Sequence, residues 1–207
     1  MVAAIFMLPA APVTQRPRCV MDLDLAIYSR RSVREYTDED VGKHTLRRLI
    51  DAATQAPSAI NEQPWSFSVV LDRALLARIS QSAKTHVLRD PPRGLPSRHL
   101  QEMLEDPDFD IFYGAPVLIV ISSVTQDLWA VENCSLAAEN LMLAACAAGL
   151  GTCWIGFAQG WLATADGKAI LGLPDTSLPV APIIIGRPKS PVPAVPRSEP
   201  RIRWISD

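Results

Sequence analysis

The sequence has few of the residues that build metal sites or disulfide frameworks. It holds four cysteines and three histidines in 207 residues, no two cysteines form a CxxC pair, and the histidines are scattered. Because structural zinc sites need closely spaced pairs of these ligands, we expect no metal site. A chain of this length can build a large core without disulfides, so we expect reduced thiols and a cytoplasmic protein.

An excess of charge of one sign is also missing. The formal net charge is −2, and the isoelectric point is about 5.9. A protein that binds nucleic acid needs surplus positive surface to neutralise phosphates. We therefore expect no nucleic-acid partner, although a local basic pocket remains compatible with these totals.

The apolar start of the chain is too short to span a bilayer. It reads VAAIFMLPAAPV, is interrupted by Pro9 and Pro12, and has no basic residue before it. A membrane helix needs about 20 apolar residues, and a secretory signal needs a basic start. We expect no membrane partner and interpret residues 1–20 as a flexible arm or an overlong start. A weak export signal is the alternative.

The rest of the chain has the composition of a folded domain, since apolar residues make up 48% of it. Leu46, Leu49, Ile50 and Ala53 recur at helical spacing and predict a helix over 43–55. Further helices are expected over 74–83, 97–105, 127–148 and 160–171, and strands over 67–71, 116–122 and 180–185. No repeat or domain boundary is visible. Helices that alternate with few strands indicate the α+β class, with one central sheet covered by helices.

The last residues, 188–207, are rich in proline and should not fold on their own. Five prolines lie between positions 188 and 200, which predicts an extended C-terminal arm. Trp204 and Ile205 near its end would leave large apolar side chains exposed to water if the arm were free. We expect them to dock on a surface, such as that of a second subunit.

Three arginines surround one serine in the segment that holds Arg30, Arg31, Ser32 and Arg34. Guanidinium groups present a fork of donors that matches phosphate oxygens, and a serine hydroxyl adds a neutral donor. The segment therefore suits a phosphate group. A solvated basic patch is the alternative, because most charge runs are of that kind.

A small polar loop, PSAINEQPW, follows the helix predicted over 43–55. The amides of Asn61 and Gln63 can both donate and accept, which suits the edge of a heterocycle. Small residues at Ser58 and Ala59 would let a flat ring approach closely. The alternative is a surface loop of ordinary turn formers.

Glycines flank the predicted strand end in GLGTCWIG, residues 149–156. Their spacing fits neither the GxGxxG fingerprint nor a P-loop. Glycines before and after a strand do let the backbone reach a ligand. Cys153 has no histidine near it in sequence, so we interpret it as a small core residue rather than a nucleophile.

Taken in order, these segments resemble the flavin-dependent nitroreductase family. The matching features are RRSVREY at 30–36, APSAINEQPW at 56–65, DPDFDIFYGAPVLIVI at 106–121, NCSLAAENLMLAACAAGLGTCWIG at 133–156 and PIIIGRP at 182–188. The resemblance covers about residues 22–200. It divides the chain into a nitroreductase-like FMN-binding domain at 21–187 and the arm at 188–207.

The resemblance implies a nitroreductase-like fold: a central, mainly antiparallel sheet surrounded by helices, in a domain-swapped homodimer with FMN at the interface. It also implies an FMN-dependent NAD(P)H oxidoreductase. Hydride would pass in ping-pong fashion from NADH or NADPH through FMN to a small-molecule acceptor, a nitroaromatic, quinone or similar electrophile. The alternatives are a family variant that performs reductive dehalogenation or flavin fragmentation, a flavin carrier without turnover, and a phosphate-binding domain without flavin.

The resemblance also assigns the expected cofactor-binding residues. Arg30, Arg31, Ser32 and Arg34 would hold the FMN phosphate and ribityl chain, and Arg197 in the arm would add a late phosphate contact. Pro57, Ser58, Ala59, Asn61 and Gln63 would line the isoalloxazine, with Asn61 supplied by the partner subunit. The backbone of Ile155 and Gly156 would face N5 of the ring. No side chain is expected to be catalytic, because the flavin carries the redox chemistry.

Overall fold

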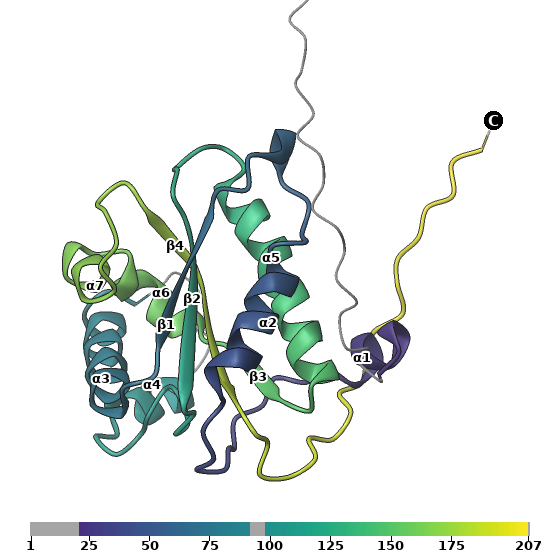
Figure 1. Cartoon of the computed structure of the whole chain (residues 1–207). Helices are drawn as coiled ribbons and strands as arrows, with labels where there is room; N and C mark the ends of the chain where they lie inside the picture. The colour runs from purple at the N-terminus through teal and green to yellow at the C-terminus, as the bar shows by residue number, and fades with distance from the viewer. Residues whose placement is uncertain (1–20, 92–97, 207) are drawn as a thin grey trace, which may run out of the picture.

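The computed structural model describes residues 21–91 and 98–206, with the backbone alone for 98–100. The helices and strands follow one another along the chain as drawn in Figure 1. They are α1 (Leu23–Ser29), α2 (Lys43–Ala53), the short η1 (Ala59–Asn61), β1 (Trp65–Val70), α3 (Arg73–Arg89), α4 (Arg98–Glu105), β2 (Val117–Ser123), α5 (Ala130–Ala147), β3 (Gly151–Trp154), α6 (Gly156–Leu162), α7 (Ala165–Ile170) and β4 (Leu178–Gly186). The expectation for residues 1–20 lies outside the described residues.

The four strands form one sheet in the order β1-β2-β4-β3, and every pairing is antiparallel. Its two central strands, β2 and β4, are buried along nearly their whole length. That burial explains why their sequences are continuous apolar runs rather than alternating ones. The expected α+β class with a mainly antiparallel central sheet is confirmed.

Helices cover both faces of the sheet and create two apolar cores (Figure 1). Alternate side chains of β2 enter opposite cores: Ile119 packs with α2 and α5, whereas Leu118 packs with α3 and α6. Helix α5 contributes its small residues to the first core, and Ala137 and Ala138 are fully buried there. α1 packs on α5, away from the sheet.

Several predicted elements differ in their limits. The helix expected over 160–171 is two helices. α6 ends at Leu162, and Thr164 caps the start of α7, where its hydroxyl accepts a hydrogen bond from the Gly167 amide at 3.2 Å. The longest helix begins at Ala130 rather than 127 and ends before Gly149, whose φ of 72° is the left-handed conformation. Gly156, expected in a turn, opens α6.

The arm after β4 has no regular secondary structure, and its docking on a second subunit stays a prediction. Between Lys189 and Ile205 the structure assigns no helix or strand, and Trp204 and Ile205 are 86% and 88% exposed in the single chain. No helix among the described residues has the length and apolarity needed to cross a membrane.

Candidate flavin site

The basic segment is fixed beside β3, the edge strand of the sheet. Ser32 forms a parallel bridge with Thr152, and the Val33 amide donates to the Thr152 carbonyl at 2.9 Å. The Tyr36 hydroxyl donates back to the Val33 carbonyl at 2.8 Å. This pairing extends the sheet by a short piece of chain and sets the direction of every side chain in the segment.

Gly151 lets the segment approach so closely. A Cβ added to Gly151 would lie 2.6 Å from Val33 Cγ2 and 2.7 Å from Val33 Cβ. Real Cβ atoms do not make such contacts, so any larger residue at position 151 would push the segment off the sheet. The glycine noted before the strand is therefore explained by a protein contact, in addition to any ligand.

Alternation along the extended segment separates the four predicted phosphate ligands into two groups. Arg30, Ser32 and Arg34 all act on the thiol of Cys153, at the far end of β3. Arg31 instead donates to the carbonyls of Tyr28 and Arg30, both at 2.8 Å, and to the Pro193 carbonyl at 3.3 Å. Arg31 thus contacts the arm, while the other three lie near enough to Cys153 to affect its pKa.

The three gathered side chains differ in how free they are. Arg30 makes an ion pair with Glu139 of α5 at 3.4 Å. Arg34 is exposed and has no carboxylate partner within the described parts of the chain. Its guanidinium carbon lies 6.0 Å from the centre of the Tyr113 ring. The site therefore offers at least one uncompensated positive charge to an anionic or electron-rich ligand.

Cys153 is buried within this group and stays neutral. Burial raises the pKa of its thiol, and the Arg34 charge, the Ser32 hydroxyl and the Arg30 charge oppose this only in part. Burial also raises the pKa of Cys134 to about 12. Because the thiolate is the reactive form of cysteine, neither residue suits a nucleophile. This agrees with the interpretation of Cys153 as a core residue.

Ile155 and Gly156 follow directly after β3. The Ile155 side chain is 4% exposed and packs in the core, while its amide donates to the Pro182 carbonyl at 2.8 Å. A Cβ added to Gly156 would meet nothing within 4 Å. The space at the Cβ position of Gly156 is therefore open, and because the Ile155 side chain is buried, only the Ile155 backbone could contact a ligand there.

The polar loop lies at the other end of α5, where Figure 1 shows η1 far from α1. Ile60, Asn61 and Gln63 have φ values of 45°, 59° and 52°, which is strained backbone for residues other than glycine. The Gln63 amide hydrogen bonds to Ser58 Oγ, and the Gln63 side chain donates to Asn61 Oδ1, each at 3.0 Å. Strain of this kind persists only where the surrounding structure holds it.

Asn133, at the start of α5, holds this loop. Its Oδ1 accepts a hydrogen bond from the Ala59 amide at 3.0 Å, whereas Ser29 at the end of α1 touches Cys146 near the other end of the helix. With a rise of about 1.5 Å per residue, these two levels of α5 are roughly 20 Å apart. One chain therefore does not bring the loop with Pro57, Ser58, Asn61 and Gln63 to the arginine segment.

Replacing Asn133 by alanine should lower the free energy of unfolding by about 1 kcal/mol, because the Ala59 amide loses its acceptor inside the protein. The buried Asn133 Nδ2 has no partner of its own, which limits the loss. Urea unfolding would measure it. Asn140→Ala is the control, since the Asn140 side-chain amide donates to the Ala52 carbonyl over a long distance of 3.4 Å and loses only a weak hydrogen bond. An equal loss in both variants would contradict this role of Asn133.

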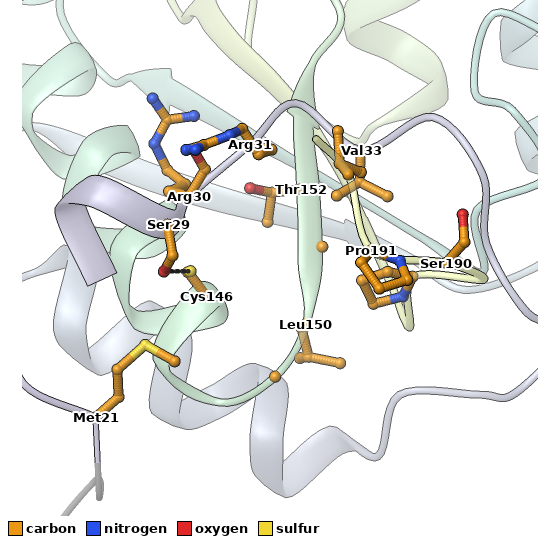
Figure 2. A pocket seen from close by; sticks show the side chains of 14 residues that line it. Met21, Ser29, Arg30, Arg31, Val33, Cys146, Leu150, Thr152, Ser190 and Pro191 are labelled. Atoms are coloured by element: carbon orange, nitrogen blue, oxygen red, sulfur yellow. Dashed lines mark hydrogen bonds between the residues drawn. The ribbon is translucent and has the colours of Figure 1, made fainter. Parts of the chain in front are cut away.

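A hollow of about 460 Å³ lies on the other side of the arginine segment (Figure 2). Ser29 and Cys146 line one side of it, and Ser190 and Pro191 line the other. Of the predicted cofactor residues only Arg30 and Arg31 line it. The hollow has the size of a small-molecule site, and Arg30 borders both the hollow and the surroundings of Cys153.

The remaining predictions concern the arm and metals. Arg197 is exposed and makes no hydrogen bond or ion pair with the described residues, so its expected phosphate contact stays a prediction. No cluster of three or more metal-ligating side chains occurs among the described side chains, those of residues 21–91 and 101–206.

Sequence reasoning missed Tyr113 and Asn133. Tyr113 lies within the segment quoted for the family resemblance, and the following Gly114 marks a turn, but nothing in the sequence connects either to Arg34. Asn133 is a single polar residue in an apolar helix, which is the available signal for a buried hydrogen bond.

Comparison with known proteins identifies the fold and the family. The nitroreductase from Bacteroides fragilis with bound FMN superimposes with a TM-score of 0.78 over 90% of this chain and 100% of that one, at 23% identity. NADH dehydrogenase from Thermus thermophilus is 39% identical over 74 residues, 35% of this chain and 36% of that protein. Iodotyrosine deiodinase from Haliscomenobacter hydrossis is 30% identical over 109 residues, 48% of this chain and 46% of that protein.

These matches differ in how much of each chain they cover. The chain spans only about a third of the length of the first curated relatives that it matches. The sequence profile of the nitroreductase family, in contrast, matches residues 27–187, from α1 to the end of β4. Because that profile covers most of the chain and the fold agrees with it, the chain belongs to the nitroreductase family.

Proposed function

We propose that this protein is an FMN-dependent NAD(P)H oxidoreductase. The observation that carries the proposal is the gathering of Arg30, Ser32 and Arg34 on one face, beside the open backbone at Gly156. A phosphate needs donors that stay charged, and a polar ribityl chain needs hydrogen-bond partners. A flat ring needs open space over backbone. Both occur within one short piece of the structure.

The residues present fit FMN. Arg30 and Ser32 would hold the phosphate and ribityl chain, and the unpaired Arg34 would meet the ring or the chain next to it. Ile155 and Gly156 would present backbone to the ring. When bound, FMN would accept hydride from NADH or NADPH and pass it to a nitroaromatic, quinone or similar acceptor. Arg31 is committed to the arm and would support this site indirectly.

We propose a homodimer in which the polar loop of the partner completes the site. The support is the separation of this loop from the arginine segment along α5, described above. Exposed apolar side chains also lie on helix α1, where Leu25 and Tyr28 are 55% and 78% exposed, and an interface over α1 would cover them. Light scattering that finds a monomer with FMN fully bound would contradict the shared site.

The compartment proposed is the cytoplasm. The three described cysteines, Cys134, Cys146 and Cys153, are all free thiols. Free thiols are the usual state in a reducing compartment.

Reductive dehalogenation is a second candidate, favoured by the match to iodotyrosine deiodinase. It would use the same flavin and a halogenated aromatic acceptor in place of a nitro compound. Product analysis after turnover with each acceptor separates the two reactions, since one releases halide and the other reduces nitrogen.

An anaerobic titration of the FMN-loaded protein with NADH and with NADPH tests the proposed function. Bleaching of the visible flavin band is expected, and the faster donor would be the preferred one. A bound flavin that stays oxidised with both donors would indicate a carrier without turnover. A chain that ignores added FMN would remove the proposal.

Arg34→Ala should weaken FMN binding about tenfold, because a charged hydrogen-bonding group is lost from the site. Quenching of FMN fluorescence by the apoprotein measures the dissociation constant. Arg78→Ala is the matched control, since Arg78 is an exposed arginine of α3 with the same charge. An unchanged Kd in Arg34→Ala, or an equal change in both, would show the assignment to be wrong.

A further inference from the structure

Tyr113 has a strained backbone for which the turn itself gives no reason. Its φ is 54°, and the following Gly114 has a φ of 68°. An aromatic residue rarely adopts this left-handed conformation, whereas glycine does so without strain. A glycine at position 113 would therefore make the same turn more easily. The strain at position 113 therefore suggests that the tyrosine side chain has a role that a glycine could not fill.

A dense set of contacts holds Tyr113 in place. The Asp110 carboxylate accepts hydrogen bonds from the amides of Phe112 and Gly114, both at 2.9 Å, and the Tyr113 amide donates to the Asp110 carbonyl at 3.0 Å. The Phe109 ring meets the Tyr113 ring edge-on, with centroids 5.6 Å apart. The loop before β2 is thus built to present this one ring.

Phe109, which contacts the Tyr113 ring, is itself held by a buried lysine. Lys84 of α3 is 3% exposed and donates to the Phe109 carbonyl at 2.8 Å. Its ammonium also lies 5.9 Å from the centre of the Phe109 ring. Tyr113 is therefore connected through Phe109 to the helix α3, which packs in the same core.

The ring presented in this way faces Arg34. The guanidinium carbon lies 6.0 Å from the Tyr113 ring centre, within the range of a cation–π interaction. Burial raises the pKa of the Tyr113 hydroxyl, although the charge of Arg34 and a hydrogen bond with its side chain lower it, so the ring stays neutral at ordinary pH. Arg34 is exposed, has a long flexible side chain and lacks a carboxylate partner among the described residues. Without the ring, little would restrict its position.

We propose that Tyr113 is a positioning residue, which holds the guanidinium of Arg34 at the end of β3 in the orientation that meets the flavin. This inference rests on the proposed function and deepens it, since it assigns to the strained turn at 110–114 a part in cofactor binding. The electron-rich ring restrains the cation in advance, so less freedom is lost when the ligand binds.

The test uses the full-length apoprotein and measures the dissociation constant of FMN by fluorescence quenching. Tyr113→Gly removes the ring and relieves the strain, so its thermal stability should not fall much, while FMN binding weakens about fivefold. Tyr113→Phe keeps a ring over Arg34 but removes the hydroxyl, which also interacts with Arg34. FMN binding within about twofold of the wild type would assign the positioning to the ring, and a loss as large as that of Tyr113→Gly would assign it to the hydroxyl.

A double-mutant cycle with Arg34→Ala supplies a readout that a purely structural role would not move. In the Arg34→Ala background, Tyr113→Gly should have no further effect on FMN binding, because the group that it positions is absent. Additive losses, or a Tyr113→Gly variant that binds like the wild type, would overturn the inference alone. A wild-type chain that does not bind FMN would overturn the proposed function with it.

Discussion

Replacing Gly151 by alanine should weaken FMN binding about 100-fold, more than the loss of any one arginine. The new methyl group would lie 2.6–2.9 Å from three atoms of Val33. Since Val33 is paired with β3 through its amide, the whole segment would have to move away from the sheet. Arg30, Ser32 and Arg34 would be displaced together, and each is worth about tenfold or less by itself.

The test compares Gly151→Ala with the double variant Val33→Gly/Gly151→Ala. Removing the Val33 side chain deletes all three close contacts, so the double variant should regain part of the FMN affinity. FMN fluorescence quenching gives the Kd, and urea unfolding gives the accompanying loss of stability, expected at about 1–3 kcal/mol. Equal FMN affinity in Gly151→Ala and the wild type would show that the segment does not hold the cofactor.

Replacing Gly167 by alanine should lower the free energy of unfolding by about 3 kcal/mol, at the upper end for overpacking. An added Cβ would lie 2.2 Å from the Trp161 carbonyl oxygen and 2.6 Å from the Leu162 Cα. Both atoms belong to the backbone of α6, which cannot rotate away as a side chain can. The junction that divides α6 from α7 would have to open, and Leu162, fully buried, would lose packing.

Gly42→Ser is the control for Gly167→Ala. Gly42 precedes α2 with a φ of −61°, and an added Cβ would meet nothing within 4 Å. A serine there can also accept hydrogen bonds from the first amides of the helix, so its unfolding free energy should change by less than about 0.5 kcal/mol. Urea unfolding curves of the two variants decide the matter. Similar stability of Gly167→Ala and the wild type would refute the backbone clash.

Periodicity and composition were sufficient for most of the fold. The apolar runs around Ile119 and Ile183 are strands because both of their faces are buried, and such strands need no alternation. The helix around Leu46 and Leu49 has one buried face, which repeats at 3.6 residues. The single helix expected over 160–171 was wrong, because a Thr164 cap and a close backbone contact at Gly167 are not visible as periodicity.

For the candidate site, the sequence could supply only the residue types: three arginines around a serine suit a phosphate, and whether they bind one stays a prediction. Which of these arginines point to the site and which point elsewhere could not be predicted. Arg31 has the same chemistry as Arg30 and Arg34, yet it donates to backbone carbonyls of α1 and the arm. The direction of each side chain depends on the pairing of the segment with β3, and that strand follows in the sequence only after more than 100 residues.

The sequence by itself determined the fold class, the family resemblance and the kinds of group that a ligand would meet, because these depend on local spacing and side-chain chemistry. Only the tertiary structure decided which groups meet. It placed Tyr113 over Arg34, brought Val33 against Gly151, and kept the loop at Asn61 away from the arginine segment in one chain. Such contacts join residues far apart in sequence, so they arise from the packing of the sheet and helices as a whole.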